Sequence, residues 1–484
     1  MSNIMRKKPV YLFEQDMQKS ELKRVLTRWG LTSLGIGAVI GGGIFTLTGI
    51  AAHDHAGPAL ALAFVIAAIG CTFASLCYAE FASILPVEGS AYAYSYGTVG
   101  EFFAWLVGWN LILEYMMGAT TVAVAWSGYF EKLLKLFGIH LPDWLMNDPF
   151  TAGEKAGAGG PIFSFNLAAV FIVFVVTTIL VRGIQESAKV NNVIVVVKLA
   201  VVLFVIIVGA FYVDVANWTP FVPERIIDAD GQGHFGWSGV ITAATIVFFA
   251  YIGFDAVSTQ AGEAINPRKD IPFAIIASLI ICTVLYILVS LVLTGMVKYD
   301  TLDLKAPVAS AFADVGITWA VFIITIAAVA GLTSVMLVML LGQTRIFLGM
   351  AKDGLLPKFF ATIHPNYKTP WKSTLLVGLL VSIVAALTPI DKVSEMCSMG
   401  TLLAFAMISG AVLLLRYQQP DLDRPYKAPW IWFVAPMGVL FNVFLMTQVR
   451  HDTWRAFLIW SSIGVVTYFL YSRRHSRLEK MDIQ

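Results

Sequence analysis

One lysine lies deep inside a long apolar run of the chain. Lys198 stands in the stretch NNVIVVVKLAVVLF, nine residues after Lys189, so a helix would carry it roughly 13 Å into the run at about 1.5 Å per residue. An ionised lysine at the centre of a bilayer costs about 2.5–3.5 kcal/mol on insertion scales, and such residues usually serve a function. We therefore interpret Lys198 as a functional cation; the alternative is a lysine that only ties backbone carbonyls together.

A glycine run forms the second candidate. The stretch GAVIGGGIFTLTG (37–49) holds Gly41, Gly42 and Gly43 in the middle of the first apolar run, and each glycine costs a helix about 1 kcal/mol relative to alanine. A helix opened there would offer N–H groups, which suit a carboxylate, and free carbonyls, which suit an ammonium or a cation. The run therefore predicts a receptor for an amino acid zwitterion. GxxxG packing of helices at Gly37 and Gly41 is the alternative.

Two acids lie in similarly apolar surroundings. Asp255 follows Gly253 in TAATIVFFAYIGFDAVSTQAGEAINP, which predicts a second interrupted helix, and Glu114 lies in WNLILEYMMG. Non-helical backbone inside a bilayer is tolerated only where protein or a water-filled cavity satisfies it. We expect Asp255 to orient the second interruption and Glu114 to face the same pocket. A purely structural role is the alternative for both acids.

The elements that position these residues are membrane helices. The chain has 484 residues, of which 58% are hydrophobic and 13% charged, and its mean hydropathy is +0.76. A soluble chain would approach about 25% charged residues, and apolar runs of about 20 residues cross a bilayer as helices. We predict an all-α polytopic membrane protein with twelve transmembrane helices, at approximately 30–52, 58–81, 100–128, 162–181, 190–212, 237–262, 272–297, 316–343, 373–390, 396–415, 428–447 and 456–472.

Charges and cysteines predict the orientation and the partners. Lys and Arg gather in the connections on the side of both termini, so we expect cytoplasmic termini in a cytoplasmic (inner or plasma) membrane. Residues 1–29 would form a cytoplasmic N-terminal segment without the apolar stretch of a signal peptide, and 473–484 a cytoplasmic tail. All four cysteines fall inside predicted spans, so we expect no disulfide-linked partner. No His/Cys cluster has the spacing of metal ligands, so we expect no metal.

The two interrupted helices occupy corresponding places in the chain. They are the first and the sixth predicted spans, so each begins a group of five spans. Two groups with an odd number of spans must have opposite orientations in the membrane. Interrupted helices at matching positions of such inverted halves indicate the binding site of a secondary transporter.

Four motifs together resemble the amino acid–polyamine–organocation transporters, and within them the bacterial cationic-amino-acid-transporter-like permeases. They are GIGAVIGGGIFTLTG (35–49), LPVEGSAYAYSYGTVGE (85–101), FFAYIGFDAVSTQAGEAINPRKDIP (248–272) and GQTRIFLGMAKDGLLP (342–357). The resemblance extends to about Pro429. It implies a leucine-transporter-type fold, with 30–212 and 237–415 as inverted repeats and two peripheral helices within 428–472.

The resemblance also implies where a solute binds. The α-carboxylate would meet backbone amides around Gly42, Gly43 and Ile44. The α-amino group would meet carbonyls around Ile40, Phe249, Ala250 and Ile252. The side chains of Phe249, Ile252 and Met339 would form an apolar pocket wall. Many relatives have a threonine where this chain has Gly42, so we expect a roomier pocket or a more mobile loop.

The resemblance assigns a role to Lys198 as well. In sodium-coupled relatives of the fold a sodium ion bridges the first and eighth spans, and in proton-coupled members of this family a lysine on the fifth span takes its place. Lys198 is therefore predicted to be the proton-coupling site, which holds carbonyls near Gly37 or Gly41 until it loses its proton. Thr333 and Ser334, on the eighth span, could have supplied sodium-type oxygens.

The sequence thus predicts a secondary active transporter that imports L-amino acids, neutral ones by preference, by proton-coupled alternating access. An amino acid exchanger or a cationic amino acid transporter of the same fold is the alternative, and a channel is the alternative from a different class. We expect no enzymatic activity and no cofactor, since the proton gradient supplies the driving force. The expected partners are the amino acid and the lipid bilayer, not nucleic acid; a small accessory membrane peptide is left open.

Overall fold

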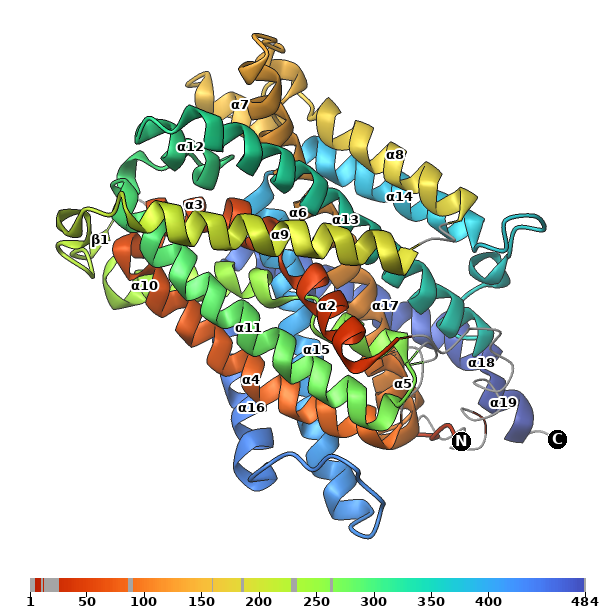
Figure 1. Cartoon of the computed structure of the whole chain (residues 1–484). Coiled ribbons are helices and arrows are strands. Elements are labelled where there is room, and N and C mark those ends of the chain that lie inside the picture. Colours follow the sequence, from red (N-terminus) through yellow and green to blue (C-terminus); the bar gives the residue numbers. More distant parts are fainter. Residues whose placement is uncertain are drawn as a thin grey trace.

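The computed structural model describes residues 5–9, 12, 26–85, 90–158, 160–183, 187–227, 233–261 and 264–482. Most of the predicted N-terminal segment 1–29 therefore lies outside the described residues, as do parts of the motifs 85–101 and 248–272. The described residues form an almost wholly helical bundle (Figure 1).

The first part of the chain contains the first interrupted helix and the long helices that follow it. We use η for 3-10 and π-helical segments. The elements are α2 (Arg28–Val39), η1 (Gly43–Leu47), α3 (Thr48–Ala51), η2 (Ala52–Ala56), η3 (Gly57–Ala59), α4 (Leu60–Ile84), α5 (Ser90–Thr98), α6 (Glu101–Leu136), η4 (Asp143–Leu145), α7 (Pro149–Lys155), α8 (Leu167–Arg182), α9 (Ser187–Ala210) and η5 (Val215–Trp218).

A small antiparallel hairpin of β1 (Ile226–Ile227) and β2 (Gly233–His234) precedes the second part of the chain. That part contains the second interrupted helix. Its elements are α10 (Gly236–Phe248), η6 (Phe249–Tyr251), η7 (Asp255–Gln260), α11 (Pro267–Met296), η8 (Tyr299–Thr301), α12 (Pro307–Asp314), α13 (Thr318–Lys352), η9 (Lys358–Ala361), α14 (Trp371–Leu387), α15 (Ile390–Gln418), α16 (Ile431–Thr447), α17 (His451–Thr467), η10 (Tyr468–Ser472), α18 (Arg473–His475) and α19 (Arg477–Asp482).

The helices are long and apolar enough for a membrane protein. By length and composition, seven helices among the described residues could cross a membrane, or eight if the bent pair Ile431–Thr447 and His451–Met481 is one span. The helical segments from Arg28 to Ile84 together count as one of the seven. Two further helices, α8 and α14, are apolar but shorter. Each of the twelve expected spans overlaps a helix, but the number of spans stays a prediction.

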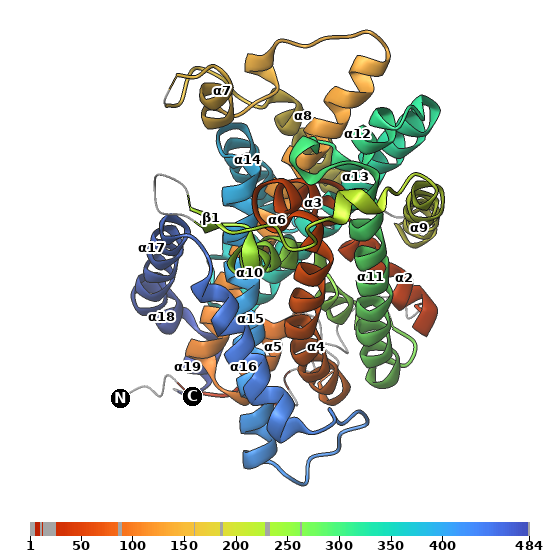
Figure 2. The same ribbon diagram turned by 90° about the vertical axis from the view of Figure 1, so that its left-hand side faces the viewer.

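The two interrupted helices lie among the longer ones. α2 packs against α9, α11 and α13, while α6 packs along α13 and α15. α8 and α14 lie side by side at the edge of the bundle (Figure 1). Figure 2 shows α17 and α18 on the opposite side from α9 and α2. The outer face of α9 is apolar and exposed, with Val196 64% accessible, as expected where lipid replaces water as the surrounding medium.

Segments near both termini meet at one face of the bundle. The Lys8 ammonium lies 2.9 Å from the Asp353 carboxylate at the end of α13, and the backbone N–H of Arg477 donates to the Asp353 carbonyl at 2.9 Å. α7 and α12 lie toward the other end of the molecule (Figure 1). This second face lies opposite the termini.

Candidate functional site

The first helical run is interrupted at the glycines, as the sequence predicts. α2 ends at Val39, Ile40 is extended (φ −72°, ψ 99°), and the π-helical turn η1 begins at Gly43. The last carbonyls of α2 therefore lack partners within the helix, and the first N–H groups of the following half point back toward the gap. The helix thus presents both donors and acceptors at one level of the bundle.

The second interruption lies between α10 and η7. Ile252 is extended (φ −62°, ψ 133°), and Gly253 has a φ of +120°, which residues with side chains rarely adopt. The Gly253 N–H lies 3.3 Å from Oδ1 of Asp255 and donates to it. A carboxylate two residues away therefore satisfies an amide that the break leaves open.

The two interruptions touch through their backbones. A Cβ built on Gly43 would lie 2.3 Å from Cα of Ala250, and a Cβ built on Gly253 would lie 2.9 Å from the carbonyl carbon of Ala38. Carbon atoms in contact are normally about 3.5–4.0 Å apart. Only glycine at both positions lets the two broken helices meet.

Lys198, on α9, lies beside the first interruption. Its Nζ donates to the carbonyl oxygens of Gly37, at 2.8 Å, and Ile40, at 3.1 Å, and the residue is only 1% exposed. The sequence predicted carbonyls near Gly37 or Gly41, so the contact with Ile40 is one residue earlier than expected. The ammonium thus pairs with carbonyls that the end of α2 leaves open.

A second side chain, which the sequence analysis missed, contacts both interruptions. The hydroxyl oxygen of Tyr286, on α11, lies 2.8 Å from the Val39 carbonyl oxygen and 3.0 Å from that of Ala250. A hydroxyl has a single hydrogen, so the two carbonyls share it. Tyr286 therefore links the two broken helices. The only signal for it was a hydroxyl in the otherwise apolar stretch VLYILV.

The eighth predicted span approaches Lys198 at Gly331, two residues before Thr333. A Cβ built on Gly331 would lie 3.0 Å from Cε of Lys198. Thr333 instead accepts a hydrogen bond from Nε1 of Trp126, at 3.0 Å, and donates to the Val329 carbonyl. Ser334 is buried on the same helix. The structure therefore places Thr333 against α6. The sequence analysis had considered it as a source of sodium-type oxygens.

The other predicted pocket residues lie on the two interrupted helices and on α13. Gly42 faces α6, where a Cβ added to it would lie 3.4 Å from Cβ of Ala125. Met339 reaches α6 at Gly118, about two turns from Ala125. The remaining residues of the predicted pocket are buried: Ile40, Ile44, Phe249, Ala250 and Ile252. Within the predicted set, Gly43 meets Ala250 directly, whereas Met339 packs against α6 at a different level from Gly42.

Glu114 and Asp255 form a pair of buried acids next to this region. Glu114 lies one turn before Gly118 on α6, and its carboxyl interacts electrostatically with that of Asp255. Oε2 of Glu114 and Oδ2 of Asp255 have no hydrogen-bond partner among the described residues. The hydroxyls of Thr401 and Tyr115 lie close to the Glu114 and Asp255 carboxyls, respectively. Buried polar atoms are usually paired, so the two carboxyl groups can accept N–H groups of a bound molecule or carry protons.

Comparison with known proteins places these features in a family. The family model described as amino acid permease matches residues 26–469. A branched-chain amino acid permease, BcaP, of Bacillus subtilis (strain 168) is 45% identical over 480 residues, 99% of each chain. A methylthioribose transporter of the same organism is 44% identical over 99% of this chain and 100% of its own. The vacuolar cationic amino acid transporter 4 of Arabidopsis thaliana is 39% identical over 87% of this chain and 68% of its own.

Proposed function

The chain belongs to the amino acid permease family of the amino acid–polyamine–organocation transporters, and we propose that it imports neutral L-amino acids by proton-coupled alternating access. It is a membrane transporter and not an enzyme. We propose a cytoplasmic-membrane location with both termini inside. The proposed architecture has twelve spans, with inverted repeats at 30–212 and 237–415 and peripheral helices within 428–472. The proton gradient would drive uptake without a cofactor.

The meeting of the two interrupted helices carries this proposal. The half-helix that starts near Gly43 offers N–H groups to an α-carboxylate, and a helix N-terminus also favours negative charge. The carbonyls of Ile40 and Ala250 already accept from Lys198 and Tyr286, but a carbonyl has two lone pairs. One lone pair on each is therefore available to an α-ammonium group.

The contacts of Lys198 support proton coupling at this residue. The charged ammonium holds the Gly37 and Ile40 carbonyls, so it fixes the end of α2 against α9. Charge-assisted hydrogen bonds are roughly twice as strong as neutral ones. Loss of the proton would weaken both contacts and let α2 move away from α9, which would couple proton release to opening of the site.

Substrate preference rests on the pocket wall and on the relatives. Phe249, Ile252 and Met339 supply an apolar wall, and the branched-chain amino acid permease is among the relatives that match over nearly the whole chain. Cationic amino acids are the second candidate. The open oxygens of Glu114 and Asp255 favour them, because a guanidinium or ammonium group would pair with both acids.

The test is uptake by proteoliposomes across twenty amino acids, with pH and sodium gradients imposed separately. We expect a pH gradient to stimulate uptake of neutral amino acids, and Lys198→Ala to abolish that stimulation. Sodium dependence of the wild type would refute proton coupling through Lys198. Stimulation only by amino acid loaded inside the vesicles would indicate an exchanger. Uptake of L-arginine that is lost in Glu114→Gln and Asp255→Asn would support the second candidate.

A further inference from the structure

On the face opposite the termini, the loop 303–306 lies between two helices of the candidate site. A Cβ built on Gly49, in α3, would lie 2.8 Å from the carbonyl oxygen of Asp303. On the other side, a Cβ built on Gly128, in α6, would lie 3.1 Å from Cβ of Lys305. The loop is therefore wedged between α6 and the second half of the first interrupted helix, and both helices carry a glycine where it packs.

The contacts just inside this loop lead directly to the site. The hydroxyl of Tyr129, next to Gly128, donates to the Phe45 carbonyl at 2.5 Å, and the two rings meet edge to face with centroids 6.1 Å apart. Phe45 follows Gly42 by three residues. The Tyr129–Phe45 contact therefore lies between the loop and the first interruption.

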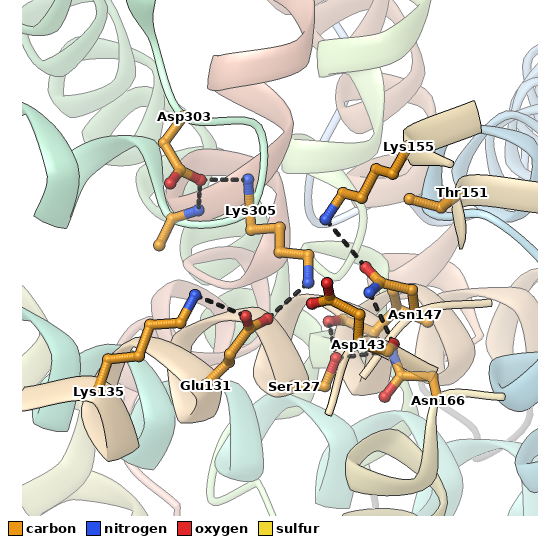
Figure 3. Close-up of polar contacts among 12 residues, drawn as sticks. Ser127, Glu131, Lys135, Asp143, Asn147, Thr151, Lys155, Asn166, Asp303 and Lys305 are labelled. Carbon is orange, nitrogen blue, oxygen red and sulfur yellow. Dashed lines mark hydrogen bonds and ion pairs between the residues drawn. The ribbon is translucent and has the colours of Figure 1, made fainter. Parts of the chain in front are cut away.

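One carboxylate joins the loop to α6. Oε2 of Glu131 lies 2.5 Å from Nζ of Lys305, and the two side chains are 13% and 30% exposed (Figure 3). Lys132, the next residue of α6, donates to Ser310 of α12 at 2.9 Å. The Asp303 carboxylate shapes the loop by accepting the N–H groups of Lys305 and Ala306. The loop and α12 are thus held to α6 as a unit.

The Glu131 carboxylate has a second partner, which lies on α6 itself. Lys135, one turn further along α6, lies 2.8 Å from Oε1 of Glu131, so that contact stays within one helix (Figure 3). Positive charge is crowded here: burial and the charge of Lys305 lower the pKa of the nearby Lys155. Without the Glu131 charge, Lys305 would lose the carboxylate that ties the loop to α6. The other acids whose charge reaches Lys135 are Asp143, on η4, and Asp303, on the loop itself, so neither ties Lys305 to α6. The loop would then be held less firmly to α6.

We propose that the 303–306 loop with α12 is a lid over the solute path on this face, and that Glu131 and Lys305 are positioning residues that latch it closed. The proposal rests on the proposed alternating access, which requires this face to open. Opening separates the loop from Gly49 and Gly128, so it breaks the Lys305–Glu131 contact. The Lys135–Glu131 contact is unaffected by that movement.

The test measures how fast a reagent labels the candidate site after the Glu131–Lys305 ion pair has been removed. A cysteine in place of Ala125, which faces Gly42, is introduced after Cys71, Cys77, Cys282 and Cys397 have been replaced by alanine. Whole cells are treated with a membrane-impermeant methanethiosulfonate reagent. We expect Glu131→Gln and Lys305→Gln each to raise the labelling rate about two- to fivefold, the range of a partly exposed ion pair.

Matched variants distinguish loss of a latch from non-specific destabilisation of the protein. Lys135→Gln removes the other partner of the same carboxylate and should leave the rate unchanged, and the exchange Glu131→Lys with Lys305→Glu should restore the slow rate. Equal rates in wild type, Glu131→Gln and Lys305→Gln would overturn the proposal, as would an equal rise in Lys135→Gln. The readout uses no solute and no gradient, so it stands apart from failure of the proposed substrate or coupling.

A second measurement avoids the cysteine substitutions. Amide hydrogen exchange of the purified full-length protein reports opening of residues 303–314 directly. We expect exchange there to be about two- to fivefold faster in Glu131→Gln than in Lys135→Gln, with α13 unchanged in both. Equal exchange of this segment in the two variants would contradict the lid.

Discussion

The two interruptions at the centre of the bundle are held open in different ways. At the first, the donors come from other helices, with Lys198 on α9 and Tyr286 on α11 reaching the carbonyls of α2. At the second, Asp255 accepts the N–H of Gly253 from only two residues away. A contact within one segment moves with that segment, whereas contacts between helices must break when the helices separate.

This difference suggests a division of labour between the two interruptions. The first depends on a charge that a proton can supply or remove, so its stability can change during a transport cycle. The second shares the Tyr286 hydroxyl at Ala250, but its break at Gly253 is fixed locally by Asp255 and keeps that contact whichever way its helix moves. We therefore expect substitutions at the first interruption to change coupling, and substitutions at the second to change mainly the amount of transport.

Gly43→Ala should have the largest effect, because it disrupts the backbone contact between the two interruptions. The added Cβ would lie 2.3 Å from Cα of Ala250, and backbone cannot give way as a flexible side chain can. Overpacking of this kind costs about 1–3 kcal/mol, so we expect transport to fall more than about tenfold. Uptake by proteoliposomes measures the fall in transport. Gly42→Ala is the matched control, since its Cβ meets only side chains at 3.4 Å or more and the Val122 Cα at 3.9 Å. Equal activity of the two variants would show that the backbones need not touch.

Lys198→Met tests the comparison most directly. It removes two charge-assisted bonds and leaves buried carbonyls unpaired, a cost of about 1–3 kcal/mol. We expect uptake of neutral amino acids to fall several-fold and to become independent of an imposed pH gradient. Transport in vesicles with and without that gradient measures both effects.

Asp255→Asn is the partner experiment at the second interruption. It also removes one charge, but the amide oxygen of asparagine can still accept the Gly253 N–H. Stimulation by a pH gradient should therefore persist in this variant. If the asparagine variant lost it as completely as Lys198→Met, the proposed division between the two interruptions would be wrong.

The sequence predicted the parts of the site that carry an unusual residue. A glycine run and a lysine inside apolar stretches are conspicuous, and both interruptions and the Lys198–Gly37 contact lie where those residues indicate. The sequence analysis missed Tyr286 because a tyrosine among apolar residues carries no charge and is therefore not conspicuous. Thr333 and Gly331 are only two residues apart, yet about 200° apart around a helix, so sequence position alone could not say which of them faces Lys198.

The fold was predictable to a similar extent. Hydropathy located a helix for each expected span, because apolar runs of span length have few other outcomes in a membrane. It gave no indication of the 303–306 loop, whose position depends on Gly49 and Gly128 from distant parts of the chain. Contacts between segments so far apart leave no periodic pattern in either one.

Tyr286→Phe should have a moderate effect that sharpens the comparison. It deletes the hydroxyl shared by the Val39 and Ala250 carbonyls and leaves the ring in place. A hydrogen bond of this kind contributes about 0.5–1.5 kcal/mol, so transport should change about two- to tenfold while stimulation by a pH gradient remains. Loss of that stimulation would show that Lys198 does not act alone at the first interruption.

Gly42→Thr should have the smallest effect and concerns only the size of the pocket. A Cβ there would meet Cβ of Ala125 at 3.4 Å and the side chain of Leu332 at 3.7 Å, both ordinary contacts, so the variant should fold. The added methyl and hydroxyl groups would occupy space beside the first interruption, so the preference among neutral amino acids should shift about two- to fivefold toward smaller side chains, since one methylene in an apolar pocket is worth about 1 kcal/mol or more. Competition of L-alanine with L-leucine for uptake measures the shift, and Gly42→Ala provides an intermediate volume. An unchanged order of preference across glycine, alanine and threonine would mean that this position does not face the solute, and that the first interruption contributes its backbone to the site at Gly43 and beyond.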